Sequence, residues 1–307
     1  MQIVANGVQL EVDVQGPEDG DPILLIMGLG MQLIGWPDEL VQMLVQRGFR
    51  VIRHDNRDVG LSEGFDRLGT PNVMVEALRQ RLRLRVRAPY QLADMAADAL
   101  GVLDALGIEH AHVCGASMGG MIAQHIAAKH PRRVKSLTLI MTTSGARSVQ
   151  QAHPRVVRLL LSRPRSGDAK AFMTHTSHVL SVIGSPAYPP EPLRLQQRLM
   201  ASFARAYRPA GTARQLVAVA ADGDRSPLLH RIVAPTRVIH GEADPLVPVP
   251  AAHDLVSKIA GAQADIVPGM GHDLPLPLLP RIAEGIARNA ERVRAAAPGQ
   301  TRVPSRS

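Results

Sequence analysis

Ser117 and the glycines on either side of it, Gly115 and Gly119, are the first residues whose types and spacing could do chemistry. This spacing is typical of a nucleophile elbow, a strained strand-to-helix turn that lifts a serine hydroxyl clear of a sheet. Glycine at the flanking positions removes side chains that would clash where the chain turns tightly. We therefore expect Ser117 to be a nucleophile. The alternative is an ordinary serine in a glycine-rich turn.

A serine hydroxyl needs a base to take its proton, and the base needs a carboxylate to hold it. Among twelve histidines, His272 is the candidate base because it lies in a glycine-rich loop after the last expected strand. Asp244 is the candidate acid, in a loop that Pro245 and Pro248 stiffen. The chain order serine, aspartate, histidine is the one expected for a nucleophile elbow on a sheet of this kind.

Other residues compete for the roles of acid and base. Glu242 is the rival acid. The rival histidines are His110, His112, His240, His175 and His178. His110 and His112 precede the elbow at the wrong end of its strand. His240 ends a strand whose following loop suits the acid better. The last two are three residues apart and suggest a metal, but no other ligand pattern supports one.

Attack by a serine on an ester creates an oxyanion, which needs preorganised N–H donors. We expect one donor at Met118, directly after Ser117, where a helix begins and its first N–H groups lack helical partners. The second donor is expected at Leu29, between Gly28 and Gly30 in the loop after the first core strand. These two glycines allow the backbone to approach a bound ligand closely.

The elements that position these loops follow from the hydrophobic pattern. Asn6-Gly7 predicts a hairpin, and strands are expected at residues 23–27, 49–53, 111–114, 134–141, 236–240 and 264–267. Helices are expected at residues 38–46, 91–106, 118–129, 249–259 and 278–293. This alternation predicts an α/β fold with a mostly parallel central sheet and helices on both faces. Functional loops in such sheets lie at the carboxyl ends of the strands.

Residues 145–231 interrupt the alternation. Strands vanish there, and helices are expected at 149–162, 169–183, 192–207 and 211–220. We therefore expect an α/β core domain formed by residues 1–144 and 232–294, with an inserted helical cap formed by residues 145–231. The last segment, 295–307, is rich in proline, glycine, serine and arginine, which predicts a disordered tail.

An insertion after the strand that follows the elbow is expected to sit above Ser117. The candidate pocket residues are Trp36, Met173, Met200 and Phe203. Any one of them could instead pack the cap onto the core. Together, the apolar side chains predict a roof suited to uncharged, small-to-medium or ring-bearing esters, and one that offers little to a charged substrate.

Composition bounds the classes of partner. The chain has 307 residues, a formal net charge of +8 and one cysteine, Cys114, which excludes an internal disulfide. Five arginines at alternate positions of residues 79–87 could attract anions, but a solvated edge segment is the simpler interpretation. No aromatic residues are interleaved with them, which argues against nucleic-acid binding.

The sequence carries no segment of membrane-spanning length, and its first residues have neither the basic start nor the apolar run of a signal peptide. We therefore expect a cytoplasmic protein without stable membrane association. Neither a cofactor nor a metal is expected, and a homodimer is left open.

Residues 115–119, 241–248 and 269–272 together resemble the α/β-hydrolase-fold serine hydrolases, and the loop 55–62 is similar to another loop of that family. Residues 27–28, 35–39 and 51–53 resemble the aclacinomycin methylesterase type. The resemblance implies a cofactor-independent carboxylic ester hydrolase with an acyl-enzyme intermediate. Its catalytic residues would be Ser117, Asp244 and His272, and its partner would be a small-molecule ester, such as a methyl ester or a lactone.

The resemblance also leaves alternatives. Many members of the family have histidine where this chain has Met27, which removes a polar neighbour of the oxyanion donor. Relatives with the same triad act as C–C bond hydrolases, perhydrolases or thioesterases. Dehalogenases and epoxide hydrolases would need aspartate in place of Ser117. A non-catalytic ligand-binding member would have a damaged triad, whereas all three residue types are present here.

Overall fold

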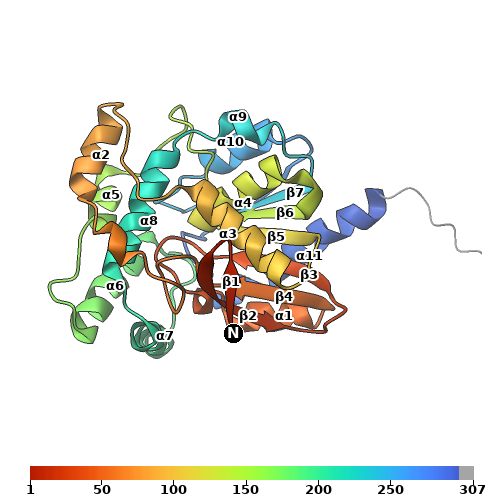
Figure 1. Cartoon of the computed structure of the whole chain (residues 1–307), viewed down its shortest axis with the longest axis horizontal. Helices are drawn as coiled ribbons and strands as arrows, with labels where there is room; N and C mark the ends of the chain where they lie inside the picture. Colours follow the sequence, from red (N-terminus) through yellow and green to blue (C-terminus); the bar gives the residue numbers. More distant parts are fainter. Residues whose placement is uncertain (297–307) are drawn as a thin grey trace, which may run out of the picture.

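The computed structural model describes residues 1–296 and gives the side chains of residues 1–293. One sheet runs through the molecule, with its strands in the order β1-β2-β4-β3-β5-β6-β7-β8 (Figure 1). The strands are β1 (Gln2–Ala5), β2 (Val8–Gln15), β3 (Asp21–Ile26), β4 (Phe49–His54), β5 (Ala111–Ala116), β6 (Val134–Ile140), β7 (Thr236–Gly241) and β8 (Gln263–Val267). The pairs β1–β2 and β2–β4 are antiparallel, and the other pairs are parallel. The α/β fold predicted from the sequence is confirmed.

Helices cover both faces of the sheet. The α-helices of this core are α1 (Asp38–Val45), α3 (Leu92–Ala105), α4 (Met118–Lys129), α9 (Ser226–Leu229), α10 (Pro250–Lys258) and α11 (Leu279–Ala296). One apolar cluster joins α1 and α11 to one face, and a second joins α3, α4 and α10 to the other. Because parallel strands are covered on both faces, β5 is buried along its whole length, as its apolar run predicts.

Five helices lie between β6 and β7: the short α9 already given with the core, and before it α5 (Pro154–Leu160), α6 (Ala169–Ile183), α7 (Pro192–Arg205) and α8 (Pro209–Asp222). We call residues 141–235 the helical insertion. Figure 1 shows α5, α6, α7 and α8 gathered to one side of the sheet, on the left of the view. The short helix α9, which falls inside the expected cap, instead packs on α4, and Leu229 joins the core cluster.

Two further differences concern segments at the surface and at the end of the chain. Helix α2 (Val73–Arg81) was not predicted; it packs against α8, and the arginine run begins in it and continues to Arg87 beyond its end. Helix α11 reaches Ala296, so the expected tail begins in helix, and residues 297–307 of that tail lie outside the described residues. Nowhere in residues 1–296 is there a helix both long and apolar enough to cross a membrane.

Candidate active site

Ser117 occupies a strained turn between β5 and α4. Its backbone has φ 53° and ψ −118°, a left-handed conformation that non-glycine residues rarely adopt. A Cβ atom on Gly115 would lie 2.2 Å from the carbonyl oxygen of Gly119, and one on Gly119 would lie 2.0 Å from that of Ile26. Both glycines are therefore required by close packing of backbone on backbone, and the local geometry is that of a nucleophile elbow.

The structure brings Ser117, His272 and Asp244 together although they lie far apart in the sequence. His272 Nδ1 lies 2.7 Å from Asp244 Oδ2, and His272 Nε2 lies 3.0 Å from Ser117 Oγ. The carboxylate can only accept, so the Nδ1–H donates to it and the neutral Nε2 is left to accept the serine O–H. The side chain of Asp244 is fully buried and that of His272 is 7% exposed, which shields the pair from water.

Backbone groups fix the orientation of the Asp244 carboxylate. Its Oδ1 accepts the N–H groups of Leu246 (2.9 Å) and Val247 (2.8 Å), which leaves Oδ2 for His272. His240, a rival base in the sequence, donates from Nε2 to the carbonyl of Val247 (2.7 Å) and so braces this loop instead of facing the serine. Burial lowers the pKa of His240, which favours the neutral ring. The rival acid Glu242 is exposed.

The loop that carries His272 is held by the helical insertion. The N–H of His272 donates to the carbonyl of Ile183 (2.7 Å), and the N–H of Gly271 donates to Ser185 Oγ (2.9 Å). The Ser185 hydroxyl in turn donates to Asp273, whose pKa is raised by burial. Sequence analysis did not find Ser185, because its partners lie 86 and 88 residues away.

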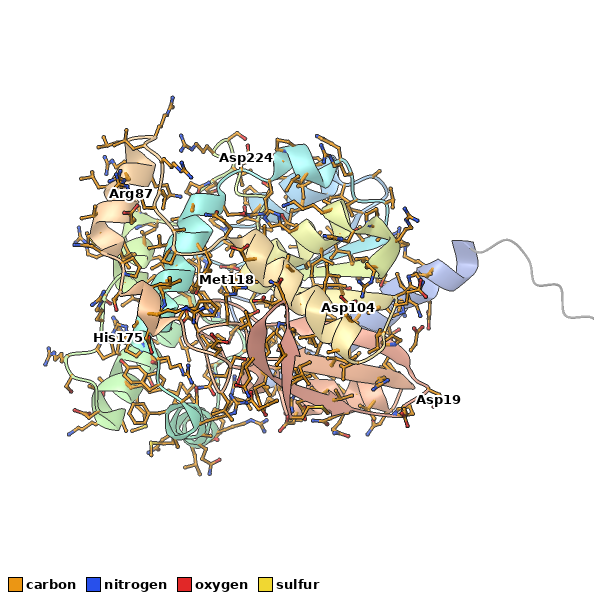
Figure 2. The ribbon with its side chains drawn as sticks, in the orientation of Figure 1. Asp19, Arg87, Asp104, Met118, His175 and Asp224 are labelled. Atoms are coloured by element: carbon orange, nitrogen blue, oxygen red, sulfur yellow. The ribbon has the colours of Figure 1, made fainter. Side chains whose placement is uncertain are left out.

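The loop after β3 lies against the nucleophile. A Cβ on Gly28 would come within 3.2 Å of the Ser117 Cβ, so the expected donor Leu29 directly follows a residue in contact with the serine. Within the described residues, the N–H groups of Leu29 and Met118 have no hydrogen-bond acceptor, whereas the N–H of Gly30 donates to Gln215 Oε1 (2.8 Å). Figure 2 shows Met118 near the middle of the molecule, between the strands and the helical insertion.

The loop of residues 55–62 links this part of the site to the insertion. Asp55 accepts from the N–H of Leu33 (2.6 Å) and from Arg205 of α7 (2.6 Å). Asp58 is bound by both Nε and Nη2 of Arg214, on α8, at 2.8 and 2.7 Å. Burial alone would raise the pKa of Asp58, but the hydrogen bonds from Arg214 lower it. The sequence pointed to this loop only through its resemblance to a loop of the family, and it did not identify the two arginines.

The four candidate pocket residues have different surroundings. Trp36 is fully buried in the apolar cluster of α1 and α11, where it packs as a core residue. Phe203 stacks with Phe172 and Tyr207, at ring-centroid distances of 5.4 and 5.2 Å. Met173 is half-buried on α6, and Met200 is 42% exposed on α7. Their contact with a substrate stays a prediction.

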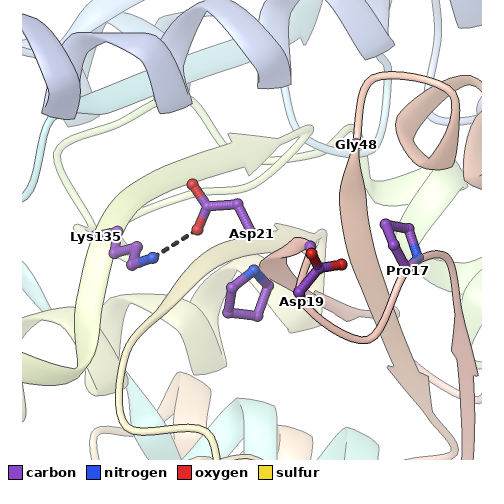
Figure 3. Close-up of a pocket in the computed structure, with 7 residues that line it drawn as sticks. Pro17, Asp19, Asp21, Gly48 and Lys135 are labelled. Atoms are coloured by element: carbon purple, nitrogen blue, oxygen red, sulfur yellow. Dashed lines mark hydrogen bonds and ion pairs between the residues drawn. The ribbon is translucent and has the colours of Figure 1, made fainter.

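Two hollows of about 590 Å³ each lie at opposite ends of the strands. One is lined by residues 150–154 and by the acid loop, including Asp244. The other lies at the amino end of β3, where Lys135 donates to Asp21 at 2.5 Å (Figure 3). Across residues 1–296, no three or more histidine, cysteine, aspartate or glutamate side chains gather in a way that could hold a metal ion. Figure 2 shows His175 on the left of the view, toward the edge of the helical insertion, away from Met118 in the middle.

Comparison with known proteins agrees with this architecture. Residues 21–276 match the family described as alpha/beta hydrolase fold. The chain is 30% identical to rhodomycin D methylesterase DauP of Streptomyces sp. (strain C5), covering 86% of this chain and 89% of that protein. It is 28% identical to a 2-hydroxy-6-oxononadienedioate/2-hydroxy-6-oxononatrienedioate hydrolase of Paraburkholderia xenovorans (strain LB400), covering 86% and 84%.

Among solved structures, the enol-lactonase from Burkholderia xenovorans LB400 superposes with a TM-score of 0.73 at 22% identity, covering 95% of this chain and all of that one. At 22% identity, this structural similarity supports the fold alone. The relatives found by sequence are hydrolases, and the match of the family to most of the chain agrees with the elbow and the sheet order described above. The chain belongs to the α/β-hydrolase fold family.

Proposed function

We propose that the protein is a serine carboxylic ester hydrolase in which Ser117 is the nucleophile, His272 the base and Asp244 the acid. One observation carries the proposal: His272 stands between the other two side chains, 3.0 Å from Ser117 Oγ and 2.7 Å from Asp244 Oδ2. Ser117 has a positive φ in the turn between β5 and α4, and it directly precedes the N-terminus of α4. This is the arrangement that activates a serine for acyl transfer.

In the first half of the reaction, Ser117 Oγ attacks the ester carbonyl carbon while its proton passes to His272 Nε2. The carbonyl oxygen becomes an oxyanion, which the unpaired N–H groups of Leu29 and Met118 stabilise by donating to it. Asp244 stabilises the imidazolium by accepting from Nδ1–H. When the tetrahedral intermediate collapses, His272 gives its proton to the leaving alkoxide, and the alcohol departs from an acyl-enzyme.

In the second half, a water molecule replaces the alcohol. His272 Nε2 takes a proton from the water, the hydroxide adds to the acyl carbon, and the ester bond to Ser117 Oγ breaks as His272 returns the proton to the serine. The products are a carboxylic acid and an alcohol. No redox step occurs, and the proposal requires no cofactor.

For the substrate we propose uncharged, small-to-medium or ring-bearing esters, with methyl esters first among them. The helices of the insertion carry apolar and aromatic side chains, including the group of Phe172, Phe203 and Tyr207. Burial of an acyl or ring surface against such groups contributes roughly 25 cal/mol per Å² of apolar area. The 30% identical relative named as a methylesterase supports a methyl ester, whereas the relative named for a dienedioate favours C–C bond hydrolysis as the second candidate.

Two measurements test the proposal. A fluorophosphonate probe should modify one residue, Ser117, as located by peptide mass spectrometry, and labelling elsewhere would contradict the assignment. Kinetics on p-nitrophenyl esters of increasing acyl length should then show turnover, with bulkier groups at Met173, Met200 or Phe203 changing KM and length preference more than kcat. An unchanged length profile in all three variants would show that other residues line the pocket. Turnover of a vinylogous diketone without turnover of any ester would favour the C–C bond alternative.

A further inference from the structure

A single buried amide joins the helical insertion to the oxyanion loop, residues 27–30. Gln215 of α8 is 0% exposed, and both ends of its side-chain amide are used. Its Oε1 accepts the N–H of Gly30 (2.8 Å), and its Nε2 donates to the carbonyl of Arg57 (2.8 Å). These partners lie 185 and 158 residues away in the sequence. Gln215 therefore ties together two loops at the carboxyl ends of neighbouring strands, β3 and β4.

The contact is close on the backbone side as well. Gly30 has φ +67°, and a Cβ there would lie 2.9 Å from Thr212 Cγ2, one turn before Gln215 on the same helix. The first turn of α8 thus lies directly against the loop, and the amide of Gln215 supplies a polar partner for the half-buried N–H of Gly30. If either hydrogen bond of the Gln215 amide is lost, a buried polar group is left without a partner, which costs free energy. The contact therefore strongly favours the one geometry in which both bonds form.

Its position decides which N–H group stays available. The Gly30 N–H is occupied by Gln215, whereas the preceding N–H of Leu29 has no acceptor within residues 1–296 and stays available beside Ser117. The start of the loop is held separately, since Asn56 Nδ2 donates to the carbonyl of Met27 (3.0 Å). Leu29 therefore lies between a fixed point on the core and a fixed point on the insertion.

The helix that carries Gln215 is itself anchored. The neighbouring Arg214 makes two bonds to Asp58 and one to Asp66 (2.7 Å), and it donates to the carbonyl of Gly69 (2.7 Å). A guanidinium bound in two-pronged fashion to a buried carboxylate fixes direction as well as distance. The bonds of Arg214 therefore fix the part of α8 that carries Gln215.

We propose that Gln215 is a positioning residue for the oxyanion hole: it holds Gly30 so that the N–H of Leu29 points at the oxygen of the tetrahedral intermediate. The inference rests on the ester hydrolysis proposed above and names a residue that touches no substrate. An N–H donor stabilises the oxyanion most when it already points at the oxygen before the negative charge develops. If the donor had to reorient during the reaction, the cost of that reorientation would offset the stabilisation.

The test compares Gln215→Leu with a matched control, Gln124→Leu. Gln124 is also a fully buried glutamine with two bonds, to the carbonyl of Thr143 and from Arg225, but it does not touch the oxyanion loop. On p-nitrophenyl butyrate we expect Gln215→Leu to lower kcat by about 10- to 100-fold with KM within about 3-fold, less than the loss of a whole oxyanion donor. Gln124→Leu should keep kcat within about 3-fold at a temperature where both variants are folded.

A second measurement separates misorientation of the Leu29 N–H from a general loss of activity. When phenylboronic acid binds, Ser117 Oγ adds to boron, the serine proton passes to His272, and the tetrahedral boronate anion places one of its hydroxyl oxygens in the oxyanion hole. Its affinity should therefore fall with Gln215→Leu by the same factor as kcat. The affinity should not change in the control. Unaltered kcat in folded Gln215→Leu, or a lower kcat with unchanged boronate affinity, would overturn the proposal. If the leucine variant does not fold, Gln215→Asn, whose shorter side chain cannot span both partners, replaces it with the same expectations.

Failure of the proposed function is distinguishable from failure of this inference. Wild-type protein without esterase activity would refute the first, whereas an active wild type with an unaffected Gln215 variant would refute only the second. Hydrogen–deuterium exchange of the peptide that contains Gly30 does not depend on activity. It should be faster in Gln215→Leu than in wild type and unchanged in Gln124→Leu, and equal exchange in all three proteins would overturn the positioning role.

Discussion

The molecule contains two sets of serine, histidine and aspartate side chains, one at each end of its sheet. At the carboxyl ends of the strands, His272 lies 3.0 Å from Ser117 and 2.7 Å from Asp244. At the amino ends, His112 Nδ1 lies 2.8 Å from Ser136 Oγ, and its Nε2 lies 3.1 Å from Asp21 Oδ2. The side-chain distances of the two sets are nearly the same.

The backbone around the two serines is different. Ser117 occupies a turn with positive φ at the start of α4, whereas Ser136 lies inside β6 and is 2% exposed. Asp21 also accepts from Lys135, so its charge is shared between two partners (Figure 3). Proximity of a serine, a histidine and an aspartate is therefore not enough to assign a nucleophile. The elbow and the unpaired N–H groups beside it are what the amino-end set lacks in the described structure.

Replacing each serine gives the sharpest contrast. Ser117→Ala should lower kcat for ester hydrolysis by at least about 10⁴-fold, because the attacking oxygen is lost. Ser136→Ala should leave kcat within about 2-fold, since its hydroxyl bonds to His112 of the amino-end set, away from Ser117. Steady-state kinetics measure both, and fluorophosphonate labelling should persist in Ser136→Ala alone. Comparable losses in the two variants would break the distinction.

Replacing each aspartate by asparagine should separate the sets again. In Asp244→Asn, the amide can donate to His272 Nδ1 and so favour the tautomer whose Nε2 carries a proton, which cannot accept one from Ser117. We expect kcat to fall by up to about 10⁴-fold. Asp21→Asn should leave kcat within about 3-fold, and the exposed Glu242→Gln serves as the nearby control. A larger loss with Glu242→Gln than with Asp244→Asn would transfer the role of the acid to residue 242.

The two histidines also differ in what supports them, since His112 lies on a strand and His272 on a loop held by the insertion. Ser185→Ala removes the hydroxyl that binds the Gly271 N–H and Asp273, and it should lower kcat by about 10-fold through misplacement of the imidazole. The control is Ser181→Ala, an exposed serine on α6 whose hydroxyl bonds to the carbonyl of His178. Equal kcat in both variants would show that the backbone bond from His272 to Ile183 suffices.

The smallest effect should be one of stability alone. Burial by itself raises the pKa of Asp21, but hydrogen bonds from Lys135 and His112 lower it to a net value below its ordinary range. A carboxylate with a lowered pKa stabilises the fold above the ordinary value of about 3.9, and this contribution is lost as pH falls through the lowered pKa.

Urea unfolding should therefore show Asp21→Asn to be less stable than wild type at pH 7, with the difference shrinking toward pH 3. We expect about 1 kcal/mol or less, because Asp21 is partly exposed and solvent screens its pairs. A difference that grows as the pH falls would contradict the sign of this linkage.

Patterns that are local in the sequence pointed to the three residues that the structure brings together, Ser117, His272 and Asp244. The positions of Gly115 and Gly119 follow from close backbone packing around one turn, and Asp244 binds the N–H groups of its own loop. The sheet and most of its helices were predicted for the same reason, since hydrophobic period and strand–helix alternation are read over short windows.

Contacts between distant segments were not predictable in this way. Ser185, Arg214 and Gln215 act through partners 86 to 185 residues away, and no local pattern specifies such a pairing. Helix α2 was missed for a different reason: the arginine run that overlaps its last turn was interpreted as a solvated edge segment. The signal that could have found it is Asn72, whose side chain accepts the N–H of Val75 as a helix N-cap.

The hydrogen bonds between the helical insertion and the loops of Leu29 and His272 have a consequence for protein engineering. Helix α8 binds the loop of Leu29, and the segment after α6 binds the loop of His272, so the insertion supports both loops of the proposed active site. A chimera that exchanges this insertion for that of a relative, in order to change selectivity, would discard those supports. Such a graft should keep Ser185, Arg214 and Gln215 at their places and vary only the residues between them.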